Sequence, residues 1–326
     1  MRVAVIGLGW PGQTHARCAA RIPGVEVAGL CDLQLEKAEA LAPEVGASAF
    51  ADYNVMLDAV RPDAVFLCTP HFVRTEPIRA IAERGIALFV EKPPAFNLDE
   101  ANECAAIIAT SGVVNSTGFM YRWARLTQRA REVVNGRPLI ATMIRGAWPV
   151  VFWEGIPSWL RQEDQSGGPM VEQGVHLIDT ARYITGDEII EAQGFGANAV
   201  ALQSNDLTVH DTVSATYRFA GGGLGSHLHN WSHSGWVWEI DTIGRDLRLT
   251  WDMASNRLFG KVDGVEIDER FDDNCYDTEI TGFVEAVRAG DPTAVRSTYA
   301  DSVRTLAAAL SAAEAIRTGA AVRVPG

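Results

Sequence analysis

Residues 3–12, with the sequence VAVIGLGWPG, decide the fold of the N-terminal part of this chain. The apolar residues 3–6 are typical of a buried parallel strand, and glycines follow at positions 7, 9 and 12. This G-x-G-x-x-G pattern allows a tight turn and lets a pyrophosphate approach the backbone at the start of a helix. We therefore expect a dinucleotide site formed by Gly7, Leu8, Gly9, Trp10, Pro11 and Gly12.

An acidic residue stands where such a site needs one. Asp32 closes the second apolar run, 20 residues after Gly12, and a carboxylate there hydrogen-bonds the ribose hydroxyls of a dinucleotide. The same carboxylate repels a 2'-phosphate, and the next residues, Leu33 and Gln34, offer no cation to offset it. The sequence therefore favours NAD over NADP as the cofactor.

The rhythm of apolar runs divides the chain into two parts. Short runs at 3–6, 25–30, 64–68, 87–90 and 113–117 alternate with helical segments such as 74–84 and 99–111, which predicts an α/β, doubly wound parallel sheet. After residue 119 the runs at 139–148 and 189–265 are longer, β-branched and aromatic, and turn signals join them. One of these, AGGGLG at 220–225, suits a hairpin better than a phosphate loop because no helix follows.

We therefore place a boundary near Met120. Residues 1–120 are expected to form a Rossmann domain. Residues 121–326 are expected to form an α+β domain with a large, mostly antiparallel, open-faced sheet and two late helices at 277–289 and 299–318.

Composition narrows the class of partner. The 326-residue chain has a formal net charge of −13 with scattered basic residues, which argues against binding to nucleic acid or to an anionic membrane surface and leaves a small molecule. The five cysteines are odd in number and far apart, so we expect reduced thiols in a cytoplasmic protein and no zinc site. No apolar stretch is long enough to predict a membrane span.

Candidate site residues follow two further predicted strands. Thr69 and Pro70 follow the strand that ends at Cys68, and the segment FVEKPP places Glu91 and Lys92 after the next strand. Ligands of doubly wound sheets bind at the carboxyl ends of the strands, so all four are expected at the cofactor site. Lys92 could hold a substrate hydroxyl beside the nicotinamide and transfer its proton, or it could be a surface lysine paired with Glu91.

A third segment reads as one helix over residues 169–185. Ser166 can cap it and Pro169 suits its first turn. Glu172, His176 and Asp179 are spaced i, i+4 and i+7, which places them on one face of an α-helix.

These segments, together with TGFMYRW at 117–123 and YDTEITGFVEAVRAG at 276–290, resemble the Gfo/Idh/MocA oxidoreductases. The resemblance covers almost the whole chain. It implies a Rossmann domain, an open-faced sheet that often mediates oligomerisation, and hydride exchange between nicotinamide and a sugar, polyol or related alcohol. It also implies that Lys92 and His176 are the catalytic lysine and histidine, with Glu172 as the acidic residue one turn earlier.

Two positions depart from the family pattern. Arg74, expected to contact the cofactor, stands where many relatives carry histidine. Glu172 replaces the aspartate that is common in inositol dehydrogenases, which weakens any assignment of inositol as the substrate.

Other residues of the second half have competing interpretations. Arg122 suits either a substrate oxygen or a salt bridge, and Trp153, before the helix with His176, is expected to stack on a sugar ring. His227, His229 and His233 share one face of a strand, where substrate or subunit contact is favoured over a metal site because no nearby carboxylate or cysteine completes a ligand set.

Together these observations predict an NAD-dependent oxidoreductase that acts on a secondary alcohol, with Lys92, His176 and Glu172 as catalytic residues. Glu172, His176, Asp179, Arg122 and Trp153 are expected to bind the substrate. Two alternatives are a redox-neutral enzyme that oxidises a sugar transiently with bound NAD, and a non-catalytic dinucleotide sensor. We expect a homodimer or homotetramer formed through the second-domain sheet.

Overall fold

The computed structural model describes residues 1–200 and 207–326, so the part of the expected 189–265 sheet at 201–206 lies outside the described residues. The chain forms two compact units. The first contains residues 1–123 and 274–303, and the second contains residues 124–273 and 304–326. This division differs from the expected one, which assigned everything after residue 120 to a single domain. The reason is that helix α9 (Cys275–Ala289) buries Ile280, Phe283 and Val284 in the hydrophobic core of the first unit.

The first unit is built on a six-stranded sheet, in which every strand pair is parallel. The strand order is β3-β2-β1-β4-β5-β6, so the sheet runs outward in both directions from β1, as expected for a doubly wound fold. The strands are β1 (Arg2–Ile6), β2 (Glu26–Cys31), β3 (Ser48–Phe50), β4 (Ala64–Leu67), β5 (Ala87–Val90) and β6 (Asn115–Thr117).

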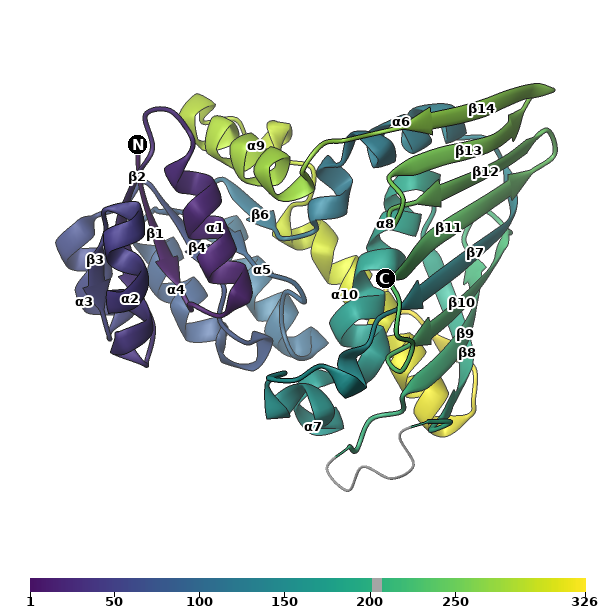
Figure 1. Ribbon diagram of the computed structural model, residues 1–326, viewed down its shortest axis with the longest axis horizontal. Coiled ribbons are helices and arrows are strands. Elements are labelled where there is room, and N and C mark those ends of the chain that lie inside the picture. The colour runs from purple at the N-terminus through teal and green to yellow at the C-terminus, as the bar shows by residue number, and fades with distance from the viewer. Residues whose placement is uncertain (201–206) are drawn as a thin grey trace. The chain divides into compact units, whose positions relative to one another are not determined.

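Helices cover both faces of this sheet (Figure 1). One core cluster joins the sheet to α1 (Trp10–Ala20), α2 (Leu35–Val45) and α9. The other joins it to α3 (Tyr53–Val60), α4 (Thr75–Glu83) and α5 (Leu98–Ser111). Gly46 and Gly112 end α2 and α5 in the left-handed conformation, a common way of ending a helix.

The second unit is built on a nine-stranded sheet of order β14-β13-β12-β11-β7-β10-β9-β8-β15. All its pairs are antiparallel except β7 with β10. The AGGGLG segment is the hairpin turn between β9 and β10, as predicted, and Phe219 N–H donates to Gly223 O across it at 2.9 Å. The strands are β7 (Leu139–Ala147), β8 (Ile189–Ala197), β9 (Thr212–Phe219), β10 (Leu224–Asn230), β11 (Val237–Gly244), β12 (Leu247–Asp252), β13 (Arg257–Val262), β14 (Val265–Arg270) and β15 (Val322–Arg323).

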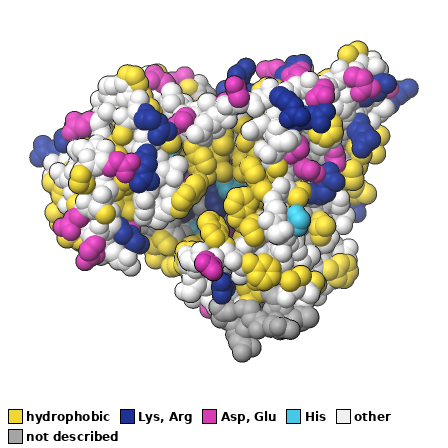
Figure 2. Space-filling model, viewed as in Figure 1, with side chains coloured by type: hydrophobic (Ala, Val, Ile, Leu, Met, Phe, Trp, Pro, Cys, Tyr) yellow, Lys and Arg dark blue, Asp and Glu magenta, His cyan; other side chains and the backbone are white. Residues whose placement is uncertain are grey.

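Helices pack on one face of this second sheet (Figure 1). They include α6 (Arg125–Val134), α8 (Val175–Thr185) and α10 (Tyr299–Thr318), while the short α7 (Glu163–Ser166) precedes α8. The other face exposes Met143, Phe195 and Leu228, so the sheet is open-faced. On the face of the molecule seen in Figure 2, acidic and basic side chains are interspersed.

Candidate active site

The fingerprint glycines have two different structural roles. Gly7 has φ +88°, and a Cβ there would lie 2.7 Å from Thr69 N; a Cβ on Gly12 would lie 1.9 Å from Gly7 O. The fold itself therefore requires both residues to be glycine. A Cβ on Gly9, at the start of α1, would meet only Pro11 Cδ, at 3.8 Å. The space over Gly9 fits the close approach that a pyrophosphate makes at such a loop.

Asp32 is connected to this loop directly. Its Oδ2 accepts a hydrogen bond from Leu8 N at 2.8 Å, and its Oδ1 accepts one from Gln34 N at 2.9 Å. Lys37, in the first turns of α2, places its Nζ 4.0 Å from Asp32 Oδ1. Leu33 and Gln34 offer no cation, as expected, but Lys37 brings one to the same carboxylate from the first turn of α2.

Arg74 is buried, with 3% of its surface exposed. Its Nε and Nη2 donate to Thr69 O at 3.0 and 2.6 Å, and its Nη1 donates to the main-chain oxygens of Glu91 and Pro93. One guanidinium thus joins the loop after β4 to the loop after β5. These backbone oxygens are its partners in the structure, and contact between Arg74 and the cofactor stays a prediction.

Glu91 turns its carboxylate into the protein. Its Oε1 lies 2.5 Å from His15 Nε2, and its Oε2 accepts a hydrogen bond from the main-chain nitrogen of Lys92 at 3.0 Å. Burial would raise the pKa of Glu91, but the hydrogen bond from His15 and the charges of His15, Lys92 and Arg74 lower it below its ordinary value. The Lys92 side chain is partly exposed at the carboxyl end of β5.

The helix that carries the second motif begins irregularly. Met170–Gly174 form a π-helical turn, and the α-helical part, α8, begins at Val175. Ser166 does not cap this helix. It ends α7, where its hydroxyl donates to Gln162 O at 2.9 Å and accepts from Gly168 N at 3.1 Å. The regular spacing expected between Glu172 and His176 is therefore altered by a π turn, a feature that is frequent at functional sites.

His176 and Asp179 are both buried on α8. The His176 ring lies 6.4 Å from the Trp238 ring at an interplanar angle of 64°. Asp179 is 1% exposed, and its Oδ1 accepts a hydrogen bond from Thr305 Oγ1 of α10 at 2.8 Å. Arg182 donates to the same hydroxyl at 2.5 Å, so these side chains join α8 to α10. Contact between Asp179 and a substrate stays a prediction.

A buried polar network under the π turn was not anticipated as a unit. Gln173 Oε1 accepts from Trp231 Nε1 at 2.8 Å and lies 3.5 Å from His229 Nε2. His229 Nδ1 lies 3.4 Å from His227 Nε2, and His227 Nδ1 lies 3.1 Å from Tyr217 Oη. The alternation along β10 indicated that these two histidines share a face, but no local signal pointed to Gln173.

The two strand histidines are held in their neutral form. Burial lowers the pKa of His229 to about 3, and burial together with the nearby His229 lowers the pKa of His227 well below its usual range. His233 is exposed in the loop after β10 and does not join them. Within residues 1–200 and 207–326, no group of three histidine, cysteine or acidic residues is arranged to hold a metal ion.

The two remaining expected substrate contacts have different surroundings. Arg122 is buried, with its Nη2 2.6 Å from Asp301 Oδ2, and its Nη1 donates to Arg296 O at 2.8 Å. Arg122 therefore forms a salt bridge, one of its two expected roles, and its contact with a substrate stays a prediction. Trp153 is 52% exposed, and its ring lies 6.4 Å from that of Trp148.

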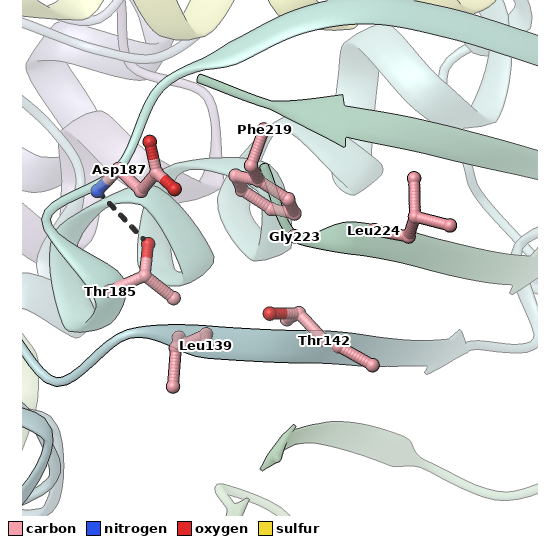
Figure 3. A pocket seen from close by; sticks show the side chains of 8 residues that line it. Leu139, Thr142, Thr185, Asp187, Phe219, Gly223 and Leu224 are labelled. Atoms are coloured by element: carbon pink, nitrogen blue, oxygen red, sulfur yellow. Dashed lines mark hydrogen bonds between the residues drawn. The ribbon is translucent and has the colours of Figure 1, made fainter. Parts of the chain in front are cut away.

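A small pocket in the second unit lies away from these residues (Figure 3). Leu139, Phe219 and Leu224 line it, and two of its polar residues form a turn in which Asp187 N donates to Thr185 Oγ1 at 3.2 Å. The Asp187 carboxylate accepts from Gly221 N at 3.0 Å. The polar groups of this pocket thus stabilise the end of the sheet and provide no catalytic constellation.

A Rossmann sheet with an intact fingerprint, an acid after β2 and a lysine after β5 define a dinucleotide-dependent oxidoreductase as the class of protein. A family model described as "Oxidoreductase family, NAD-binding Rossmann fold" matches residues 1–119, and one described as "GFO/IDH/MocA C-terminal domain" matches residues 127–248. The chain belongs to the Gfo/Idh/MocA family, as its motifs indicated.

Two named relatives indicate the class of reaction. D-glucoside 3-dehydrogenase of Escherichia coli (strain K12) is 31% identical over 240 residues, covering 69% of this chain and 68% of that protein. The scyllo-inositol 2-dehydrogenase (NAD(+)) of Bacillus subtilis (strain 168) is 28% identical over 348 aligned positions, covering 99% and 96%. The chain is therefore an NAD(P)-dependent oxidoreductase that acts on CH–OH groups of sugars or polyols.

A solved structure shares the fold. Myo-inositol 2-dehydrogenase from Lactobacillus plantarum superposes with a TM-score of 0.85 at 24% identity, covering 100% of this chain and 99% of that one. Among the described residues, no helix has the length and apolar character that crossing a membrane requires.

Proposed function

We propose that this protein is an NAD-dependent dehydrogenase that oxidises a secondary hydroxyl of a sugar or related polyol, with Lys92 as the residue that holds the reacting oxygen. The observation that carries the proposal is the placement of Lys92. It is the second residue after β5, at the carboxyl end of the parallel strands where dinucleotide enzymes bind their ligands, and Arg74 and Glu91 fix its loop.

The chemistry requires two separate transfers. The alcohol loses its hydroxyl proton to a base and its carbinol hydrogen as hydride, leaving a ketone; the nicotinamide, when bound, accepts the hydride. Lys92 stabilises the developing alkoxide through its ammonium group. His176 takes or relays the hydroxyl proton, and Glu172, four residues earlier and partly exposed, orients the histidine or a ring hydroxyl.

The cofactor preference rests on Asp32. Both its oxygens already accept main-chain hydrogen bonds, which fixes the carboxylate beside the fingerprint loop, where it accepts from ribose hydroxyls and repels a 2'-phosphate. Lys37 offsets part of that repulsion because its ammonium lies at the same carboxylate. We therefore infer that NAD is preferred and that NADP is used with lower efficiency.

We also propose that the second unit serves the substrate and the assembly. Trp153 is exposed and suited to stacking on a pyranose ring. The open sheet face, with Met143, Phe195 and Leu228 exposed, is the surface through which copies of this chain form a dimer or tetramer. Light scattering on the wild type and on Phe195→Glu tests the assembly, which should dissociate in the variant; a monomeric wild type would contradict it.

The central test is NADH formation at 340 nm with NAD and a panel of polyols, aldoses, sugar acids and glycosides. Lys92→Ala should lose turnover by about 100-fold or more while NAD affinity changes little, because the lost interaction acts on the reacting oxygen. Lys261→Ala, an exposed lysine on β13, is the matched control and should behave as wild type.

Three other outcomes would reject parts of this proposal. Retained turnover in Lys92→Ala would remove the role of the lysine. Product formed without net NADH would show a redox-neutral enzyme, in which the bound cofactor is regenerated within each cycle. Tight NAD binding with no turnover across the panel would show a sensor.

A further inference from the structure

The proposed function does not account for the buried partner of Glu91, which is His15. His15 lies on α1 with no exposed surface, packed 5.9 Å from the Phe66 ring and 5.1 Å from the Phe89 ring, and its partner Glu91 is also buried. Taking two such groups out of water is costly, and replacing a buried pair by apolar residues is often neutral or stabilising. Stability alone is therefore a weak reason for this pair.

The geometry shows what the pair connects. An ionised carboxylate only accepts hydrogen bonds, so both partners of Glu91 donate: His15 Nε2 to Oε1 at 2.5 Å, and the main-chain nitrogen of Lys92 to Oε2 at 3.0 Å. Each oxygen is thus used by a different element. One faces α1, the helix that begins at the fingerprint, and the other faces the backbone of the lysine.

Two more contacts fix the same residue. Arg74 donates to the main-chain oxygen of Glu91, so Glu91 is held through both its carbonyl and its carboxylate. A Cβ on Gly118 would lie 3.1 Å from Cδ, Oε1 and Oε2 of Glu91, so a larger residue there would press on the carboxylate. The position of Glu91 is therefore determined from several sides.

We infer that His15 and Glu91 are positioning residues for Lys92: they join the helix that follows the nucleotide fingerprint to the main chain of the lysine. This inference rests on the proposed role of Lys92. The pair orients Lys92 and restricts its ammonium group to positions close to the reacting oxygen. A displacement of about 1 Å at such a group is enough to lower turnover by about 100-fold.

The test compares His15→Leu, which removes the donor, with His15→Gln, whose side-chain amide keeps an N–H donor. His15→Leu should lower kcat by about 10- to 100-fold while KM for NAD changes by less than about threefold, because positioning of the lysine is lost and the fingerprint is not. His15→Gln should recover most of the loss. Gly118→Ala, which keeps every charge but presses on the Glu91 carboxylate, should also lower kcat.

A second readout does not need turnover. Reductive methylation of Lys92, followed by mass spectrometry with Lys261 as the internal standard, should change in rate by severalfold in His15→Leu and Gly118→Ala. A purely structural pair would lower the unfolding temperature and leave both kcat per folded molecule and this labelling ratio unchanged. If His15→Leu does not fold, Gly118→Ala and His15→Gln decide the question.

The possible results distinguish a failure of this inference from a failure of the proposed function. This inference alone would be overturned if Lys92→Ala is inactive but folded His15→Leu has wild-type kcat and labelling. If His15→Leu does not fold, wild-type values in Gly118→Ala and His15→Gln would overturn it in the same way. Turnover retained in Lys92→Ala would overturn the proposed function and this inference with it. Loss of kcat with an altered labelling ratio and recovery in His15→Gln would support the assignment.

Discussion

Acid should destabilise the second unit through His229, which lies buried between Gln173, His227 and the ring of Trp238. Burial lowers its pKa from an ordinary 6.5 to about 3. The folded protein therefore keeps this ring neutral at pH values where the unfolded chain binds a proton. The stability that follows is fully present above about pH 6.5 and is lost progressively as the pH falls toward 3.

The size of the effect follows from the same shift. Each unit of pH between the unfolded and folded pKa values of a single group changes the free energy of unfolding by about 1.4 kcal/mol. At about pH 5, some 1.5 units below the unfolded pKa, His229 should account for a loss of about 2 kcal/mol. His229→Gln removes this titration and keeps a polar side chain beside Gln173, so its stability should fall less with acid.

Urea unfolding at about pH 7.5 and about pH 5 measures the difference. Tryptophan fluorescence follows mainly the second unit, because of the nine tryptophans only Trp10 and Trp123 lie in the first. His233→Gln, at an exposed position, is the control and should retain the wild-type pH dependence. Equal losses of the free energy of unfolding in the wild type and His229→Gln between the two pH values would contradict the role of His229.

Three further results are expected. Gly9→Ala should raise the Kd for NAD by about tenfold or more with little change in unfolding temperature, because the fold has room for the methyl group and the pyrophosphate needs that space. Gly12→Ala should instead reduce the yield of folded protein, since its Cβ would collide with Gly7 O; equal thermal stability of the two variants would contradict this distinction. Lys37→Gln should lower kcat/KM for NADP by about fivefold and leave that for NAD within about twofold, in keeping with one exposed charge; unchanged use of NADP would show that Lys37 does not act on the 2'-phosphate.

Local signals predicted most of the fold. The predicted ranges 87–90 and 299–318 match β5 and α10 to the residue, because the periodicity of a strand or helix is set by neighbouring residues. The place of α9 was missed for the opposite reason. Its apolar stripe predicts a helix, but no neighbouring residue indicates that the helix packs on a sheet whose first strand lies more than 250 residues earlier.

The candidate site shows the same limit at the level of side chains. Arg122 and Asp179 have the chemistry of substrate ligands, but each is bound by a group far along the chain, Asp301 and Thr305. Arg74, which is expected at the cofactor, binds backbone oxygens of two loops, and these partners could not be foreseen from the sequence. Residue type indicates what a side chain can bind, and only the fold determines which partner lies within bonding distance of it.

The π turn at Met170–Gly174 is the place where regular helical spacing fails, and its surroundings explain why. A Cβ on Gly174 would lie 3.3 Å from His227 Cε1, so the backbone passes close over the strand histidines. Gln173, one residue earlier, accepts a hydrogen bond from Trp231 Nε1. A wider turn lets the chain make this close approach and still enter α8 without a break. Native sequences depart from local rules mainly at functional or strained sites, and the π turn is one reason to test the roles that we propose for Glu172 and His176.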